Sequence, residues 1–259
     1  MKELRRVLSI QSHVCSGYAG NRSITFPLQL NSFEVDTIHT VMKCTHSRYP
    51  TFTGPVLSVS DFKSIIHGLT ENGLIDNYDY IMTGYMFSAE LLKEVAALIK
   101  SIKARNPNLI YLCDPVMGDI WPAIAEHHSR GKMYVPSELL PVYQEEILPL
   151  ADILTPNQCE LELLVGKPLK TFEEIKNVLN SEQFSEKIVV LTSDLSLKGN
   201  SITGFAKNKS EKSVYKFQVP RLDITFVGSG DLFSASLLAA LNHGSEVGQS
   251  FVQIIQSSL

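Results

Sequence analysis

The stretch F-V-G-S-G-D-L-F-S at residues 226–234 combines glycines and a carboxylate in a spacing suited to phosphate chemistry. It predicts a tight turn at Gly228 and Gly230, followed by a helix that begins near Asp231 and stops at Gly244. The free N–H groups of such a helix N-terminus bind anions, and glycines let a phosphate come close. Asp231 would repel a resting phosphate, but it could take a proton from a hydroxyl that attacks phosphorus. The alternative is an acid that only complements the helix dipole.

Further carboxylates occur in D-P-V-M-G-D at 114–119 and in T-P-N-Q-C-E at 155–160. Asp114 and Asp119 follow an apolar run, and hard oxygen ligands of this kind suit Mg²⁺. A plain turn is the alternative, because Asp, Pro and Gly all form turns. Glu160 could help to hold the metal or its waters, although Asn157 and Glu160 also have the spacing of a helix capping box.

Strand-like and helix-like segments alternate along the chain, which predicts an α/β protein with a mostly parallel sheet covered on both faces. The segments 201–206 and 214–219 are expected to form an antiparallel pair late in the sheet. Ligands of such folds bind outside the carboxyl ends of the strands. The polar residues expected at that edge are Ser12, Gly84, Tyr85, Asp114, Thr155, Asn157, Thr192, Ser193 and Gly228 to Asp231. At Thr192 and Ser193 the hydroxyls could bind phosphate or simply cap.

The composition excludes several classes of function. The chain has 259 residues, 44% of them hydrophobic, and a net charge of -4 without a basic cluster, so no nucleic-acid partner is expected. Its apolar runs are too short for a bilayer, and residues 1–10 do not form a signal peptide. Four scattered cysteines without a C-x-x-C motif favour reduced thiols in the cytoplasm. A lysine-bearing phosphate loop and a dinucleotide fingerprint are both missing.

Several motifs together identify a resemblance. G-S-G-D at 228–231, C-D-P-V-M-G-D at 113–119 and T-P-N-Q-x-E at 155–160 resemble the ribokinase-like superfamily. S-I-Q-S-H-V at 9–14, G-Y-x-G-N-R at 17–22, T-G-Y at 83–85 and M-Y-V-P at 133–136 resemble its pyridoxal kinase family. The similarity extends from about Arg6 to about Asn242 in the same order. It implies a single ribokinase-like kinase domain over residues 1–259, with three layers.

The resemblance also implies an activity, namely transfer of the ATP γ-phosphoryl group to the 5′-hydroxymethyl group of pyridoxal, pyridoxine or pyridoxamine. Asp231 matches the catalytic base, and the Gly228–Gly230 amides would stabilise the transferred group. The residues matched to substrate binding are Ser12, Gly17, Ser47, Tyr85 and Asp231. Those matched to ATP are Asp114, Tyr134, Asn157, Glu160, Thr192, Ser193, Gly228, Ser229 and Gly230. Asp119 and Glu160 match the Mg²⁺ region, and Asp114, Thr155 and Thr192 match a K⁺ or Na⁺ site. A homodimer is implied as well.

Two departures from the family pattern leave alternatives open. The connector 120–132 is longer than usual, and its His127-His128 pair is interpreted as exposed loop. The chain also stops at Leu259, earlier than in family members, so it is expected to be shortened at its C-terminus. One alternative is therefore a weak or catalytically silent form that binds B6 vitamers or pairs with a full-length subunit. Another is a hydroxymethylpyrimidine kinase, against which the loop around Ser47 and the T-G-Y stretch argue.

Overall fold

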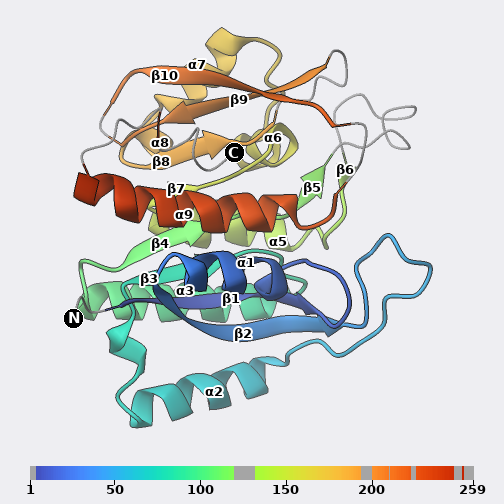
Figure 1. The fold of residues 1–259 in the computed structure, drawn as a ribbon, viewed down its shortest axis with the longest axis vertical. Helices are drawn as coiled ribbons and strands as arrows, with labels where there is room; N and C mark the ends of the chain where they lie inside the picture. The colour runs from blue at the N-terminus through green and yellow to red at the C-terminus, as the bar shows by residue number, and fades with distance from the viewer. Residues whose placement is uncertain are drawn as a thin grey trace.

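The computed structural model describes residues 4–119, 132–193, 200–209, 211–222, 226–247 and 253. An eight-stranded sheet forms the middle layer, with strand order β10-β9-β8-β7-β4-β3-β1-β2 (Figure 1). Its strands are β1 (Arg5–Val14), β2 (Phe33–Lys43), β3 (Tyr80–Thr83), β4 (Ile110–Cys113), β7 (Ile153–Leu154), β8 (Ile188–Leu191), β9 (Ser201–Lys207) and β10 (Val214–Pro220). Neighbouring strands are parallel from β2 to β8, whereas β9 runs antiparallel to both β8 and β10. The predicted α/β class and the late antiparallel pair are both confirmed.

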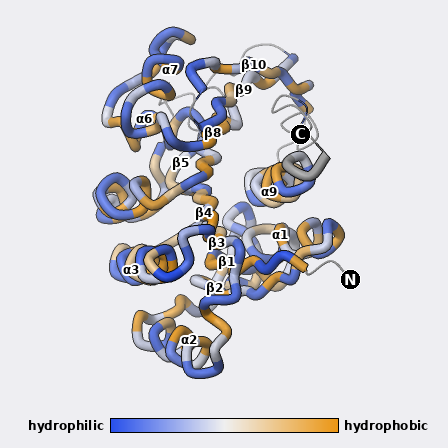
Figure 2. The backbone as a smooth tube through the Cα atoms, turned by 90° about the vertical axis from the view of Figure 1, so that its left-hand side faces the viewer, coloured by the Kyte–Doolittle hydropathy of each residue, from blue (hydrophilic) through white to orange (hydrophobic). Residues whose placement is uncertain are grey.

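Helices cover the two faces of the sheet unequally. α1 (Asn21–Leu30) and α9 (Ser229–Val247) pack side by side on one face (Figures 1 and 2). The helices associated with the opposite face are α2 (Val59–Glu71), α3 (Ala89–Arg105), α5 (Leu139–Val142), α6 (Gln158–Val165), α7 (Phe172–Leu179) and α8 (Glu182–Ser185). Short 3-10 turns at Ile75–Asn77 and Leu148–Leu150 and a π turn at Tyr143–Ile147 complete this side.

Alternation along the strands explains why both faces need cover. In β1, Val7 belongs to the core beneath α1 and α9, whereas Leu8 and Ile10 belong to the core on the other face. Successive side chains of a strand point to opposite faces, so a strand buried on both sides is apolar nearly throughout. The short apolar runs in the sequence are therefore strands of a sheet buried on both faces.

Several predicted boundaries are wrong in detail. The apolar run 6–11 predicts a first strand followed by a loop, but β1 continues through Ser12 and His13, because β2 also extends and His13 pairs with Met42. The sequence predicts a helix over 60–69 with Ser60 as its cap, but Ser58 caps α2, because its Oγ accepts the N–H of Asp61 at 3.1 Å. α9 begins at Ser229 and runs through Gly244, so this glycine does not end the helix.

Helix α1 contains Pro27 and is nevertheless continuous. The sequence predicts a helix over 137–148 interrupted at Pro141, but the structure divides this segment into α5 and the turns that follow it. A second sheet pairs β5 (Gly118–Asp119) with β6 (Lys132–Met133) in antiparallel fashion. The predictions for the connector, including His127-His128, lie outside the described residues, apart from Lys132. Among the helices of the described part, none is long and apolar enough to cross a membrane.

The order of the strands locates a crevice. The chain passes from β1 outward to β2 and then returns beyond β1 to β3, so the winding direction reverses between β1 and β3. Ligands of open α/β sheets bind outside the carboxyl ends of the strands at such a reversal. Ser12 lies near this end of β1, and Gly84 and Tyr85 follow β3.

Candidate active site

Asp231 lies in the first turn of α9 and is held from the opposite end of the chain. Its Oδ2 accepts a hydrogen bond of 2.8 Å from the N–H of Gly20, the residue that precedes α1. Gly20 is buried and has a φ of 57°, and a side chain there would collide with the backbone and hydroxyl of Ser12. The carboxylate of Asp231 is therefore fixed beside the end of β1.

The turn before α9 packs backbone against backbone. Gly228 has a φ of 81°, and a Cβ atom on it would lie 2.2 Å from the carbonyl oxygen of Tyr18. Ser23 Oγ donates to the carbonyl of Gly228 at 3.1 Å. Only glycine combines this backbone angle with so close an approach. The glycine turn and the loop before α1 thus form a single unit that positions Asp231.

The first amides of α9 are free to bind an anion. The Leu232 N–H donates to the Gly228 carbonyl at 3.0 Å, which closes the first turn. Within the described part of the chain, no acceptor takes the N–H groups of Ser229, Gly230 or Asp231. Such groups at a helix N-terminus, together with the helix dipole, attract phosphate.

A buried polar cluster lies below this turn. Ser234, one helical turn after Asp231, donates from Oγ to Asp114 Oδ2 at 3.2 Å and lies 2.9 Å from Thr155 Oγ1. All three side chains are buried. They come from α9, from the end of β4 and from the end of β7, so the cluster brings together two of the predicted cation ligands, Asp114 and Thr155.

Glu160 belongs to a neighbouring network. Its Oε2 accepts the Asn157 N–H at 2.9 Å, and Asn157 Oδ1 accepts the Glu160 N–H at 2.9 Å, so the capping box is confirmed. Glu160 Oε1 also accepts the Met117 N–H at 3.1 Å, and Asn157 Nδ2 donates to the Gly118 carbonyl at 2.8 Å. The pair therefore caps α6 and at the same time holds the segment between Asp114 and Asp119.

The carboxylates crowd one another. Burial, followed by the charge of Asp231, raises the pKa of Asp114 to about 8, against the lowering effect of the Ser234 and Thr155 hydroxyls. Burial and the Asp114 charge raise the pKa of Glu160 well above its ordinary value, and burial raises the pKa of Asp231. No arginine or lysine of the described residues forms an ion pair with these three groups. Such a site is stabilised by protons or by cations.

The donor set suits a cation that shares its ligands with phosphate. Among the described residues, no three His, Cys, Asp or Glu side chains are arranged to hold a metal ion by themselves. Mg²⁺ is usually bound by one or two carboxylates together with waters and substrate phosphates. Asp119 is exposed on β5, whereas Glu160 is buried. The residues present therefore fit an ion that arrives with the nucleotide.

Tyr85, Thr192 and Ser193 follow the carboxyl ends of β3 and β8, and within the described part of the chain none of them forms a hydrogen bond with Asp231. Tyr85 is half-buried, which raises the pKa of its hydroxyl, and its carbonyl accepts from Thr40 Oγ1 at 3.0 Å. The predicted nucleotide contacts Thr192 and Ser193 use backbone groups to bind the start of α6, through Thr192 N–H to Pro156 O and Gln158 N–H to Ser193 O.

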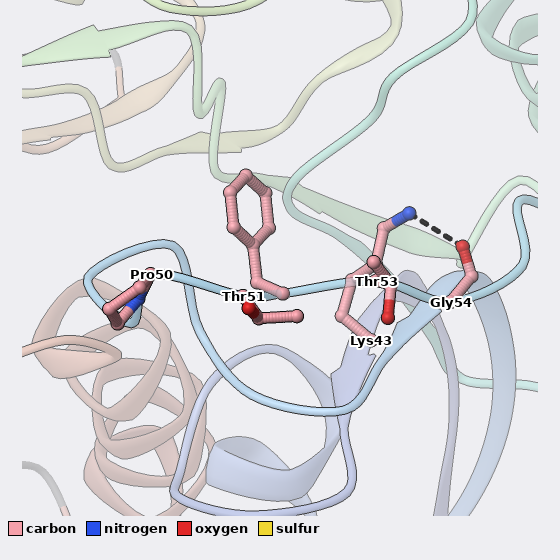
Figure 3. A pocket seen from close by; sticks show the side chains of 6 residues that line it. Lys43, Pro50, Thr51, Thr53 and Gly54 are labelled. Carbon is pink, nitrogen blue, oxygen red and sulfur yellow. Dashed lines mark hydrogen bonds between the residues drawn. The ribbon is translucent and has the colours of Figure 1, made fainter.

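Three predicted residues lie on loops. Gly17 has a φ of 90°, and a Cβ atom there would lie 3.4 Å from the His46 ring. Ser47 is exposed on the loop that follows β2, and Tyr134 is 43% exposed just after β6. A pocket of about 600 Å³ lies on the Ser47 loop and is lined by Lys43 and residues 50–54 (Figure 3). It contains no carboxylate, so it is not where a hydroxyl would be deprotonated.

The structure adds Gly20, Ser23 and Ser234 to the predicted set. Ser234 could have been found from the sequence. It lies three positions after Asp231, and residues three apart in a helix lie on the same face. Gly20 lies within the G-Y-x-G-N-R motif, but nothing in the sequence indicates its contact or that of Ser23, since their partners Asp231 and Gly228 are 211 and 205 positions away.

Comparisons with known proteins identify the family of this chain. Residues 65–255 match the family model described as phosphomethylpyrimidine kinase. The chain is 41% identical over 250 residues to pyridoxal kinase from Homo sapiens, covering 92% of this chain and 78% of that protein. Among solved structures, it is similar to pyridoxal kinase from Leishmania donovani in complex with ADP and pyridoxamine, with a TM-score of 0.81, 33% identity, and coverage of 92% and 79% of the two chains. Pyridoxal kinase from Entamoeba histolytica gives a TM-score of 0.83, 28% identity, and coverage of 99% and 86%.

Proposed function

The chain belongs to the pyridoxal kinase family, and from that premise we propose that it transfers the γ-phosphoryl group of ATP to the 5′-hydroxymethyl group of pyridoxal, pyridoxine and pyridoxamine. The observation that carries this proposal is the Asp231 carboxylate, held by the Gly20 N–H at a helix N-terminus whose first amides have no acceptor among the described residues. A base and an anion site thereby lie within one turn of each other.

Asp231 acts as the general base. Its carboxylate takes the proton of the hydroxymethyl group while the hydroxyl oxygen bonds to the γ-phosphorus, and the bond from that phosphorus to the β-γ bridging oxygen breaks to release ADP. Its raised pKa makes the carboxylate a stronger base than an exposed aspartate. The amides of Gly228, Ser229 and Gly230 stabilise the charge on the transferred group.

Two cation sites complete the proposal. Asp119 and Glu160 would hold Mg²⁺, which supplies charge neutralisation at the phosphates, and Asp114, Thr155 and Thr192 would hold K⁺ or Na⁺. The crowding of Asp114, Glu160 and Asp231 without basic partners among the described residues supports a need for positive charge here. The Ser234 hydroxyl orients Asp114 toward the α9 turn.

The vitamer and the nucleotide approach from different sides of Asp231. Ser12, Gly17, Ser47 and Tyr85 would contact the pyridine substrate, and the positions of Ser12 and Tyr85 near the ends of β1 and β3 support this assignment. The residues that would contact ATP are Asp114, Tyr134, Asn157, Glu160, Thr192, Ser193 and Ser229. One N–H of the Asn157 side-chain amide already donates to the Gly118 carbonyl, so its second N–H is the donor available to the nucleotide.

We further propose a single kinase domain, a cytoplasmic location and a homodimer. The four cysteines of the described chain are all free, in keeping with a reducing compartment. Light scattering on the purified chain measures its mass in solution, and a mass near 28.8 kDa would refute the dimer.

The test is a steady-state assay of the purified 259-residue chain with pyridoxal, Mg-ATP and K⁺, following pyridoxal phosphate by absorbance. Asp231→Ala is expected to lower turnover about 10²- to 10⁴-fold while pyridoxal still binds. The exposed first-turn acid Asp61→Ala, at the start of α2, is the matched control and should leave turnover unchanged. Near-normal turnover in Asp231→Ala would refute the assigned base.

Two other functions make different predictions in the same assay. A silent vitamer-binding form would bind pyridoxal without turnover, in the wild-type chain as in Asp231→Ala. The family model described as phosphomethylpyrimidine kinase favours a second candidate, a hydroxymethylpyrimidine kinase. A higher kcat/KM with hydroxymethylpyrimidine than with pyridoxal would establish that candidate instead.

A further inference from the structure

Two cysteines leave the sheet next to each other, at the carboxyl ends of β1 and β2. The β1–β2 register ends with Val14 opposite Lys43, so one further residue along each chain aligns Cys15 with Cys44. Two backbone hydrogen bonds continue the pairing beyond the strands. The Cys15 N–H donates to the Lys43 carbonyl at 2.8 Å, and the Ser16 N–H donates to the Cys44 carbonyl at 3.0 Å.

This alignment gives the two residues the backbone spacing of neighbouring strands, while the Cys44 Sγ atom lies 3.8 Å from both Thr45 Oγ1 and Thr51 O. Neighbouring strands lie about 4.7–4.9 Å apart, and a disulfide requires Cα atoms about 4.4–6.8 Å apart. Residues opposite each other in a parallel register point to the same face of the sheet. Cys15 and Cys44 therefore share a side with His13 and Met42, the aligned pair two positions earlier.

The pair differs from the other cysteines in access, and Cys44 also differs from Cys113 and Cys159 in acidity. Cys15 is exposed and Cys44 is partly exposed, whereas Cys113 and Cys159 are buried. The Thr45 hydroxyl and backbone groups lower the pKa of the Cys44 thiol, while burial raises the pKa of Cys113 and of Cys159 to about 12. The thiolate is the reactive form, so Cys44 is the thiol that reacts first.

We propose that Cys15 and Cys44 form a reversible disulfide when the chain meets a small-molecule disulfide oxidant. The Cys44 thiol loses its proton and its sulfur attacks the oxidant, whose S–S bond breaks and releases one thiol. The Cys15 thiol then loses its proton and attacks the Cys44 sulfur of the mixed disulfide, releasing the second thiol. The protein loses two electrons and two protons, and the oxidant is reduced to two thiols.

Forming this bond would move the loop that carries Ser47. To reach Cys15, the Cys44 Sγ atom must leave Thr45 Oγ1 and Thr51 O, each 3.8 Å away, so the bond acts on the loop to which these two residues belong. The loop after Cys44 moves with it, because three hydrogen bonds connect the start of the loop to residues 51–54. The Cys44 N–H donates to Thr53 O at 2.9 Å, and Thr45 Oγ1 donates to Thr51 O at 2.9 Å. Lys43 Nζ donates to Gly54 O at 2.7 Å (Figure 3).

A consequence for the substrate rests on the proposed function. Ser47 lies three residues after Cys44, and Gly17, which lies two residues after Cys15, approaches His46 of the same loop. A displaced Ser47 would lose its contact with pyridoxal. Loss of one hydrogen bond corresponds to about a 3- to 10-fold rise in KM for pyridoxal, with kcat retained.

The disulfide is tested without reference to activity. The wild-type chain is incubated with glutathione disulfide, its free thiols are alkylated at acidic pH, and it is digested with trypsin. The expected product is a peptide of residues 7–22 linked to residues 44–48, which thiol reductant separates. Alkylated Cys113 and Cys159 serve as internal controls. Glutathione adducts on Cys15 and Cys44 without the linked peptide, or no oxidation at all, would refute the pairing.

Cys15→Ser and Cys44→Ser separate the bond from its consequence. After oxidant treatment, both variants should keep the KM for pyridoxal that the wild type has before oxidation. The oxidised wild type should show the higher KM until reductant is added. A linked peptide with an unchanged KM would refute the effect on Ser47 and leave the disulfide standing. A chain that forms the linked peptide but never phosphorylates pyridoxal would refute the proposed function alone.

Discussion

Replacing Gly228 with alanine tests how closely the α9 turn must fit the loop before α1. The new methyl carbon would lie 2.2 Å from the Tyr18 carbonyl oxygen, whereas ordinary contacts begin at 3.4 Å, so one of the two segments must move by about 1 Å. The shift would act on the same two segments that the 2.8 Å hydrogen bond between Gly20 and Asp231 joins. Misplacement of a catalytic group by that distance costs about 10²-fold in rate, and we expect a loss of this size in kcat/KM.

Part of the effect comes from backbone strain alone, and two other glycines isolate it. Gly166 and Gly73 have φ angles of 68° and 67°, close to the 81° of Gly228, but a Cβ atom on either would meet nothing within 4 Å. Their alanine variants should each lower the free energy of unfolding by about 1–2 kcal/mol while kcat/KM stays at the wild-type value.

Steady-state kinetics with pyridoxal and urea denaturation, measured on all three variants, decide the outcome. The reasoning fails if Gly228→Ala retains wild-type kcat/KM. It also fails if Gly166→Ala or Gly73→Ala loses as much activity as Gly228→Ala, since strain rather than the contact with Tyr18 would then account for the loss.

Three further predictions concern the acidic cluster. Ser234→Ala should lower the free energy of unfolding by about 1–3 kcal/mol in urea denaturation, because a buried oxygen of Asp114 loses its donor. An equal loss in the partly exposed Ser236→Ala would contradict this. The folded Asp114 keeps its proton up to a pKa of about 8, while the unfolded carboxyl loses it near pH 4. The free energy of unfolding should therefore fall as pH rises between about 4 and 8, by at most about 1.4 kcal/mol per pH unit for this group, and Asp114→Asn should show a shallower fall in cation-free buffer. Asp119→Ala should raise the Mg²⁺ concentration for half-maximal velocity about 10-fold, and an unchanged Mg²⁺ titration would exclude Asp119 as a ligand.

Local patterns in the sequence predicted the elements of the fold because those elements depend on near neighbours. The stripe of Leu91, Leu92 and Val95 predicted α3, and the structure buries all three residues. The spacing of Asn157 and Glu160 predicted a capping box that the structure contains. Both patterns lie within one or two helical turns, where side chains and backbone groups meet whatever the rest of the chain does.

Predictions failed where a distant partner decides the local structure. β1 was expected to end at Gln11, but pairing of His13 with Met42 of β2 extends it to Val14. Gly244 was expected to stop α9, but the glycine is buried within the helix, where burial outweighs its low helix propensity.

The candidate site divides in the same way. Asp114, Asp231 and the glycine turn were identified from their motifs, whereas Gly20, which holds Asp231, was not. A hydrogen bond from a backbone N–H does not require a particular side chain, so the sequence does not predict it. The roles of all the candidate site residues toward ligands stay predictions.

The packing of α9 on α1 has a consequence for how the protein is synthesised. While the ribosome is still making residues before Ser229, the face of the sheet beneath α1 lacks its second covering helix, and apolar residues such as Val7, Met82 and Leu112 stay partly uncovered. The nascent chain would carry this apolar surface until α9 has been added. Chaperone binding to stalled nascent chains should therefore be strong for those that end before α9 and weak once α9 has emerged.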